Sequence, residues 1–230
     1  MARHKRSPKS SRDLKRRPAF RSIPDRILIV TEVSKTEPSY FWMLISELGL
    51  TTAKVTIVGD GGSAPINVAE EAIKILEQDD DFEQIYCVFD RDRHVSYAQA
   101  LNLVREMSES KKFKKKKILS ITSVPCFEIW YLLHVSGSRK PYESASTGGS
   151  PAQILISDLR KNEIFADYLK NGCESFFHEI ADKREEAVNR ATRFLQAANE
   201  EGAEEFHENP STRVHLLVRA LTEISNKKNQ

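Results

Sequence analysis

The stretch Ile27-Leu-Ile-Val-Thr-Glu32, followed at once by Val33-Ser-Lys-Thr-Glu-Pro-Ser-Tyr-Phe41, decides the fold. Four apolar residues in a row, rich in β-branched side chains, are typical of a strand that is buried on both faces. Thr36 can cap the helix that follows, because a carboxylate and a proline come next and both suit a first helical turn. Glu32 therefore lies at the carboxyl end of a core strand, where open α/β sheets bind their ligands.

Strand patterns and helix patterns alternate from this stretch to about residue 135. Apolar runs predict strands over residues 26–31, 53–58, 84–89 and 118–122. Helical spacing predicts helices over residues 37–48, 67–78 and 96–107, and another after Pro125. This alternation predicts an α/β fold with a doubly wound, mainly parallel four-stranded sheet.

The chain is expected to have four parts: a basic flexible arm (1–25), an α/β core (26–135), a loop or linker (136–150) and a helical region packed on the core (151–230). The patterns in the last part predict helices over residues 152–159, 163–169 and 175–199, and another that starts at 209–212.

Charge is unevenly distributed along the sequence. Residues 1–26 contain ten Lys or Arg and two Asp, whereas the rest of the chain has more acidic than basic residues. Such an arm indicates contact with nucleic acid, and a solubilising tail is the alternative. The run Lys111-Lys-Phe-Lys-Lys-Lys-Lys117 has the same two interpretations, a solvated loop or a phosphate contact that includes Lys114 and Lys115.

Nothing in the sequence predicts export or a membrane span. No apolar run approaches the roughly 20 residues that cross a bilayer, and the basic N-terminus is not followed by an apolar signal segment. The cysteines Cys87, Cys126 and Cys173 are widely spaced and odd in number, which favours a reducing compartment. We therefore expect a cytoplasmic protein that does not bind a membrane.

A second acidic site follows the third predicted strand, in Val88-Phe-Asp-Arg-Asp92. Together with Glu32 it places three carboxylates at strand ends, and oxygen ligands of this kind suit Mg²⁺ or Mn²⁺. Such a metal orients a phosphodiester and neutralises developing negative charge. Glu32 is expected to ligate the metal or to act as general acid or base. The alternative is that these acids are loop carboxylates paired with Arg91, Arg93 and Lys35.

Four blocks of the sequence resemble the signature blocks of the RloB family. They are Glu32-Val-Ser-Lys-Thr-Glu-Pro-Ser-Tyr-Phe41, Phe89-Asp-Arg-Asp-Arg-His94, Pro125-Cys-Phe-Glu-Ile-Trp-Tyr-Leu-Leu-His134 and Asn209-Pro-Ser-Thr-Arg-Val214, in the family's order. The resemblance implies a prokaryotic protein linked to anti-phage defence, with an ATPase partner. It also implies a core similar to the Toprim domain of topoisomerases, primases and some nucleases.

The same resemblance implies roles for individual residues. It implies that Glu32 is the general acid or base and that Asp90 and Asp92 bind Mg²⁺. Glu128 is a fourth catalytic candidate, as a metal ligand or its positioner, and the alternative is a helix first-turn acid. The residues expected to contact phosphate are Lys35, Arg91, His94, Lys114 and Lys115.

One position departs from the family pattern. The family usually has Gly after the first Glu, and this chain has Val33. A β-branched residue resists the unusual backbone angles that glycine permits, so we expect either a more regular loop after Glu32 than in the family or an altered activity.

These observations lead us to expect a Mg²⁺-dependent Toprim-like nuclease that acts on RNA, tRNA included, or on DNA as the effector of an abortive-infection system. The alternative is a non-catalytic Toprim-like module that regulates a defence complex. A third class, nucleotidyl transfer as in Toprim primases, uses the same metal chemistry and has no further motif in its favour. The sequence leaves the oligomeric state open.

Overall fold

The computed structural model describes residues 26–32, 36–51, 55–59, 64–144, 149–170 and 172–228. The predicted arm (1–25), Val33 and Lys35 lie outside these residues. In the first half of the chain, strands and helices alternate in this order: β1 (Ile27–Thr31), α1 (Thr36–Glu47), β2 (Val55–Val58), α2 (Pro65–Gln78), β3 (Gln84–Asp90), α3 (Tyr97–Glu109), β4 (Lys117–Val124) and α4 (Glu128–Val135).

The second half of the chain is mainly helical. Its elements are α5 (Pro151–Leu159), the 3₁₀ helix η2 (Glu163–Phe165), α6 (Phe177–Ala181), α7 (Arg184–Glu200), β5 (Ser211–Thr212) and α8 (Val214–Lys228). No helix in the described part of the chain combines the length and apolarity needed to cross a membrane.

The strands form one sheet in the order β2-β1-β3-β4-β5. The pairs β2–β1, β1–β3 and β3–β4 are parallel, so the carboxyl ends of these four strands share one edge. Every residue of β1 is buried, because both faces of the sheet are covered, which explains its unbroken apolar run. The α/β class and the parallel core are as predicted.

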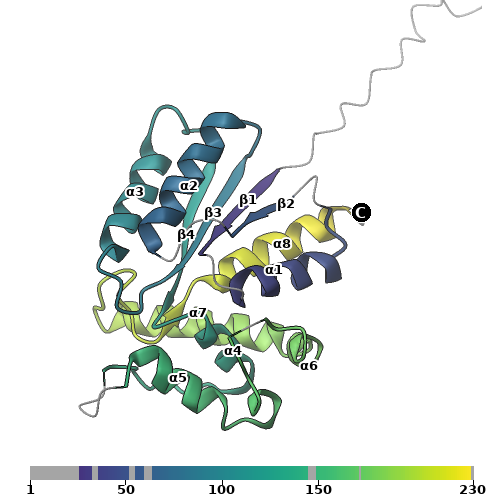
Figure 1. Ribbon diagram of the computed structural model, residues 1–230, viewed down its shortest axis with the longest axis vertical. Helices are drawn as coiled ribbons and strands as arrows, with labels where there is room; N and C mark the ends of the chain where they lie inside the picture. Colours follow the sequence, from purple (N-terminus) through teal and green to yellow (C-terminus); the bar gives the residue numbers. More distant parts are fainter. Residues whose placement is uncertain are drawn as a thin grey trace, which may run out of the picture.

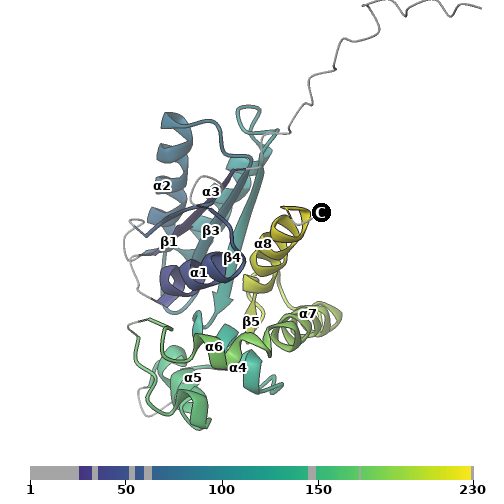
Figure 2. The same cartoon turned by 90° about the vertical axis from the view of Figure 1, so that its right-hand side faces the viewer.

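Helices cover the two faces of the sheet separately. Alternate residues of β1 point to opposite faces: Leu28 and Val30 pack with α2 and α3, whereas Ile27 and Ile29 belong to a larger cluster that includes α1, α4 and α8. Figures 1 and 2 show α2 and α3 on one side of the sheet, with α1 and α8 on the other. Helices α4 to α7 lie beyond the carboxyl edge of the strands.

An aromatic cluster fixes the helices at this edge. The ring of Tyr40 in α1 lies 5.5–6.1 Å from the rings of Phe41, Phe127, Trp130, Tyr131 and Phe177. These rings are fully buried and meet mostly edge to face, a favourable geometry for aromatic pairs. The cluster therefore holds the first turns of α1 and α4 against the ends of the strands.

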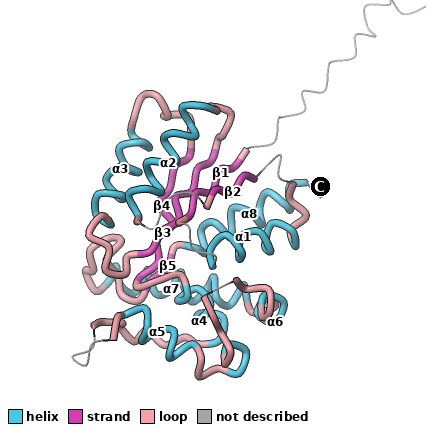
Figure 3. The backbone as a smooth tube through the Cα atoms, in the orientation of Figure 1, coloured by secondary structure: helices cyan, strands magenta, loops and turns pink. Residues whose placement is uncertain are grey.

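The sheet has five strands where four were predicted. Residues 209–212 were expected to start a helix, but Ser211 and Thr212 pair antiparallel with Ser123 and Val124 of β4. Helix α8 begins only at Val214. Figure 3 shows this short strand at the edge of the sheet. The interpretation failed because a two-residue strand has no periodicity of its own, and its partner strand is far away in sequence.

Two predicted helices are shorter than expected. In place of a helix over 163–169 there is one 3₁₀ turn, and the guanidinium of Arg160 binds the carbonyl of Tyr168 at 2.8 and 3.0 Å. That contact turns the carbonyl away from a helical partner. The helix predicted over 175–199 is divided into α6 and α7 by Asp182 and Lys183. Apolar residues keep helical spacing across this break, so periodicity could not locate it.

A buried ion pair fixes the chain between β5 and α8. Arg213 binds both carboxylate oxygens of Glu208 at 2.8 and 3.1 Å, and both side chains are less than a tenth exposed. The guanidinium also lies 4.0 Å from the centre of the Phe206 ring. Removal of one partner of such a pair leaves an uncompensated buried charge.

We therefore expect Glu208→Gln to lower the free energy of unfolding by about 3–5 kcal/mol, measured by urea denaturation. The control is Asp79→Asn, which breaks the more exposed Arg26–Asp79 pair and should cost no more than about 1 kcal/mol. Equal effects of the two substitutions would show that the Arg213–Glu208 pair does not support the fold.

Candidate functional site

The parallel pairing of β1 and β3 brings the first two predicted acids together. Val88 of β3 is the register partner of Thr31, so Glu32 and Asp90 both lie where the strands end. The backbone N–H of Asp90 donates to Oε1 of Glu32 at 3.4 Å. The N–H of Phe127, just before α4, donates to Oδ2 of Asp90 at 3.0 Å. The ends of two strands and the start of a helix thus meet at one point.

Asp92 reaches the same point because the chain leaves extended geometry after Asp90. Its φ is +29°, an uncommon value for a residue other than glycine, although Asp tolerates it better than most. Two hydrogen bonds hold the turn: the N–H of Arg91 donates to the Ser123 carbonyl at 2.9 Å, and the N–H of Asp92 donates to the Pro125 carbonyl at 2.8 Å. The Asp-x-Asp spacing therefore places both carboxylates at the ends of β3 and β4.

Glu128 enters from the first turn of α4 and is 1% exposed. Its Oε1 accepts a hydrogen bond from the hydroxyl of Tyr168 at 2.8 Å and lies 3.3 Å from Nζ of Lys170. Both partners come from the helical half of the chain. The predicted core and helical region therefore contribute side chains to the same site.

The four predicted catalytic residues line one cavity of about 210 Å³. The lining residues are Glu32, Thr36, Glu37, Asp90, Asp92, His94, Cys126, Glu128 and Lys170. Sequence reasoning missed Glu37 and Lys170. Glu37 was interpreted only as a first-turn acid, although its position five residues after Glu32 is a signal that could have been used. Lys170 has no comparable signal, because its segment has no regular pattern.

Burial is the main cause of raised pKa values for three carboxylates of this cavity. Burial, reinforced by nearby acids, raises the pKa of Glu32 from near 4.5 to about 7 and that of Glu37 to about 8. Burial and the charges of Glu37, Glu32 and Glu128 raise the pKa of Asp90 well above its ordinary range. Burial opposes the charge of Lys170, but Glu128 outweighs this effect, so the pKa of Lys170 is raised. The site therefore favours bound protons or a bound cation.

The carboxylate oxygens of the cavity are chemically suited to bind a hard divalent cation. Three buried carboxylate oxygens, Oε2 of Glu37, Oδ1 of Asp92 and Oε2 of Glu128, have no hydrogen-bond partner among the described residues. Mg²⁺ takes oxygen ligands and keeps several waters, so it does not require a complete protein cage. Within the same residues, no three acidic, His or Cys side chains stand in a preformed chelating arrangement. A cation would therefore be held by some of these oxygens together with water.

The residues expected to contact nucleic acid fall in two places. Arg91 and His94 lie on the loop that carries Asp92, whereas Lys114 and Lys115 line a hollow near Arg26, where β1 begins. Lys35 lies outside the described residues. The two groups of residues therefore lie at opposite edges of the sheet.

A second cavity of about 430 Å³ shares Asp92 with the first and is also lined by Arg91 and Arg93. Arg91 donates to the His207 carbonyl at 3.3 Å, and Arg93 donates to Oγ of Ser144 at 3.1 Å. Among the described residues, neither arginine forms an ion pair with an acid. The described contacts therefore do not support the alternative in which Arg91 and Arg93 neutralise the acids of the site.

The pKa shifts predict how stability depends on pH. Between the ordinary pKa near 4.5 and the raised value of about 7, the folded protein holds the Glu32 proton more tightly than the unfolded chain does. The free energy of unfolding should therefore fall as pH rises through this window. One pKa unit corresponds to about 1.4 kcal/mol, so Glu32→Gln should stabilise the protein by up to about 3 kcal/mol at pH 8 and by little at pH 4.

The measurement is urea unfolding at pH 4 to 8 in the presence of a chelator. The control is Glu70→Gln, which neutralises an exposed acid on α2 and should keep the wild-type pH dependence. A Glu32→Gln variant with the wild-type pH slope would contradict the raised pKa.

Comparison with known proteins agrees with the sequence blocks. A model of the family described as RloB-like protein matches residues 27–221, from the start of β1 into α8. The match therefore includes all five strands and all five acids of the cavity. Searches of curated proteins and of solved structures gave no significant match. The family match covers most of the sequence, and the chain belongs to the RloB-like protein family.

Proposed function

We propose that this RloB-like protein is a metal-dependent nuclease that hydrolyses phosphodiester bonds in RNA, tRNA included, or DNA. The observation that carries the proposal is the convergence of five acids on one cavity, three of them with raised pKa values. Clustered carboxylates with perturbed pKa values are typical of functional sites and costly in a purely structural one.

The placement of these acids supports a Toprim-like arrangement. In Toprim enzymes, whose core the RloB family is expected to resemble, an acid follows one core strand and Asp-x-Asp follows a later one. Here Glu32 follows β1, and Asp90 and Asp92 come at the end of β3, its neighbour in the sheet. The antiparallel β5 is an addition to the four parallel strands on which that resemblance rests.

Asp90, Asp92 and Glu128, with Glu37 beside them, would hold the cation, for which Mg²⁺ and Mn²⁺ are the candidates. When bound, a divalent cation supplies positive charge to the phosphodiester and to a nearby water. The pKa of Glu32 is raised to about 7, close to neutral pH, which suits a general acid or base. Lys170 places a fixed positive charge in the same cavity, where it can attract the phosphate.

The second cavity supports a nucleic-acid substrate. Two guanidinium groups, from Arg91 and Arg93, are held there by neutral acceptors, so their charges are available for phosphates on either side of the cleaved bond. Because Asp92 belongs to both cavities, such phosphates would lie next to the acids.

The biological setting is a further part of the proposal and rests on the family resemblance. We infer that the protein is the effector of an anti-phage, abortive-infection system and acts with an ATPase partner. A nuclease that damages its own cell requires restraint, which a partner of this kind can provide. Assembly into a homo-oligomer is compatible with this role.

A second function has one observation in its favour. In the described residues the acids are not arranged as a ready chelate, and Glu128 already has a positive partner in Lys170. A module that regulates a defence complex without catalysis would need no metal. Substitution of the acids distinguishes the two functions.

Metal binding is tested first, by thermal unfolding with and without millimolar Mn²⁺ or Mg²⁺. A metal at 100 times its dissociation constant raises the free energy of unfolding by about 2.7 kcal/mol. The melting temperature of the wild type should therefore rise by roughly 5–10 °C. The double variant Asp90→Asn/Asp92→Asn should lose this rise. Without metal at pH 8 it should melt no lower than the wild type, because it relieves repulsion between the carboxylates. Glu70→Gln/Glu106→Gln, which removes two exposed acids, should keep the rise. A rise that persists in Asp90→Asn/Asp92→Asn would place the metal elsewhere.

Cleavage is tested next, on tRNA and on single- and double-stranded DNA with the protein and its co-expressed ATPase partner. Glu32→Gln should lower the cleavage rate about 100-fold or more, because it removes the general acid or base. Glu70→Gln should cleave like the wild type. If both Glu32→Gln and Asp90→Asn retain full defence against phage, the catalytic proposal fails and the regulatory module is supported.

A further inference from the structure

A large hollow lies at the edge of the sheet opposite the acids. It has a volume of about 830 Å³ and lies where β1 begins and where the α3–β4 loop enters β4. Its lining contains three carboxylates and six cations, which are Arg26, Lys111, Lys112, Lys114, Lys115 and Lys116. The hollow is therefore positively charged, in contrast to the acidic cavity.

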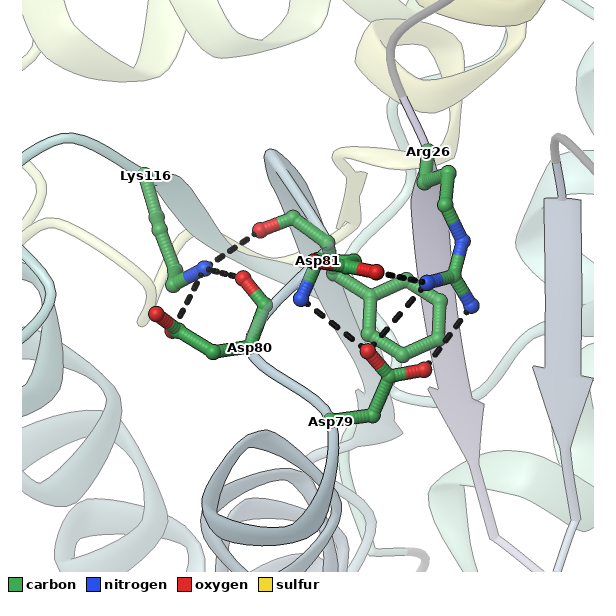
Figure 4. Close-up of polar contacts among 6 residues, drawn as sticks. Arg26, Asp79, Asp80, Asp81 and Lys116 are labelled. Atoms are coloured by element: carbon green, nitrogen blue, oxygen red, sulfur yellow. Dashed lines mark hydrogen bonds and ion pairs between the residues drawn. The ribbon is translucent and has the colours of Figure 1, made fainter.

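Three of these cations are already paired with acids of the fold, and one of them is Lys112, whose Nζ lies 2.9 Å from Oε1 of Glu77. Arg26 binds both carboxylate oxygens of Asp79 at 2.9 and 3.2 Å and lies over the ring of Phe82. Lys116 donates to the carbonyls of Asp80 and Phe82 at 2.5 and 2.7 Å. Figure 4 shows Arg26 and Lys116 on either side of the turn formed by Asp79, Asp80 and Asp81 after α2. Arg26 and Lys116 are therefore committed to the fold.

The remaining lysines face solvent on an ordered loop. Phe113 is 5% exposed and anchors the loop, and the N–H of Lys116 donates to its carbonyl at 2.8 Å. Lys111, Lys114 and Lys115 are exposed, and none of them has a hydrogen bond or ion pair with another described residue. Like charges held close together repel each other, and an anion that bridges them removes this cost.

The basic N-terminal segment joins the chain at the same edge. Nine Lys or Arg occur among residues 1–25, and this segment connects to the fold at Arg26, which lines the hollow. The sequence that leads directly to Arg26 is therefore basic, as is the loop that lines the hollow, whereas the rest of the chain is mildly acidic.

We propose that this hollow, with Lys111, Lys114 and Lys115 as its contacts, binds the phosphate backbone of a polynucleotide at a distance from the acids. The seven residues of β3 separate the two sites, which corresponds to roughly 20 Å along the strand. A duplex rises about 3.4 Å per base pair, so roughly six base pairs span that distance. The inference deepens the proposed function: the substrate is a nucleic acid with a helical part, not a nucleotide or a short oligomer.

Binding is measured by fluorescence anisotropy with 16-base-pair RNA and DNA duplexes in the presence of a chelator, so no catalysis is needed. The variant Lys111→Gln/Lys114→Gln/Lys115→Gln should bind at least about 10-fold more weakly at 150 mM salt. The slope of log affinity against log salt concentration should be smaller in magnitude by about three, that is, by about one for each lost phosphate contact. The control Lys74→Gln/Lys140→Gln/Lys161→Gln removes the same charge from exposed, ion-paired lysines and should bind like the wild type.

Length is the second readout. The wild type should bind a 16-base-pair duplex more tightly than a 4-base-pair duplex, and the test variant should lose most of this difference. Equal binding by the test variant and the control would overturn the inference. So would wild-type binding of polyglutamate with the same dependence on these lysines, because that result would indicate an acidic protein as the ligand. Lysine-dependent duplex binding by a protein that cleaves nothing would support this inference and refute the proposed nuclease.

Discussion

The parallel alignment of β1 with β3 is the constraint on which the rest of the structure depends. It brings Glu32 and Asp90 to the same edge of the sheet, and the aromatic cluster around Tyr40 holds α1 and α4 so that their first-turn acids join them. These carboxylates cannot all be charged in so small and buried a space without a counter-charge. The fold thus accepts an electrostatic cost at one point, and the apolar packing on both faces of the sheet offsets it.

Much of this arrangement could be predicted because its signals are local. The unbroken apolar run of β1 and the acids that follow β1 and β3 can be read from a few neighbouring residues, and parallel strands end at one edge. Glu37 was missed because a first-turn acid has an ordinary role in helix stability. Lys170 was missed because its contact with Glu128 exists only after the helical half has folded against the sheet, and no periodicity marks its segment.

The errors in the fold have the same origin. Strand β5 has two residues, and it exists because β4 offers an unpaired edge, which is information from a distant part of the chain. The division between α6 and α7 falls within continuous helical spacing, so the apolar pattern carries no trace of it. The contact of Arg160 with the carbonyl of Tyr168, in the segment after the 3₁₀ turn, also depends on a side chain that helix propensity does not consider.

The pairing of Glu128 with Tyr168 and Lys170 determines when the cavity is completed during synthesis. A ribosome releases the four parallel strands and the acids first, and the hydroxyl and ammonium groups that complete the cavity emerge later. A nascent or truncated chain that stops before Tyr168 would carry the acids without their internal positive charge. The internal counter-charge of the cavity is therefore in place only after the chain has been made as far as Lys170.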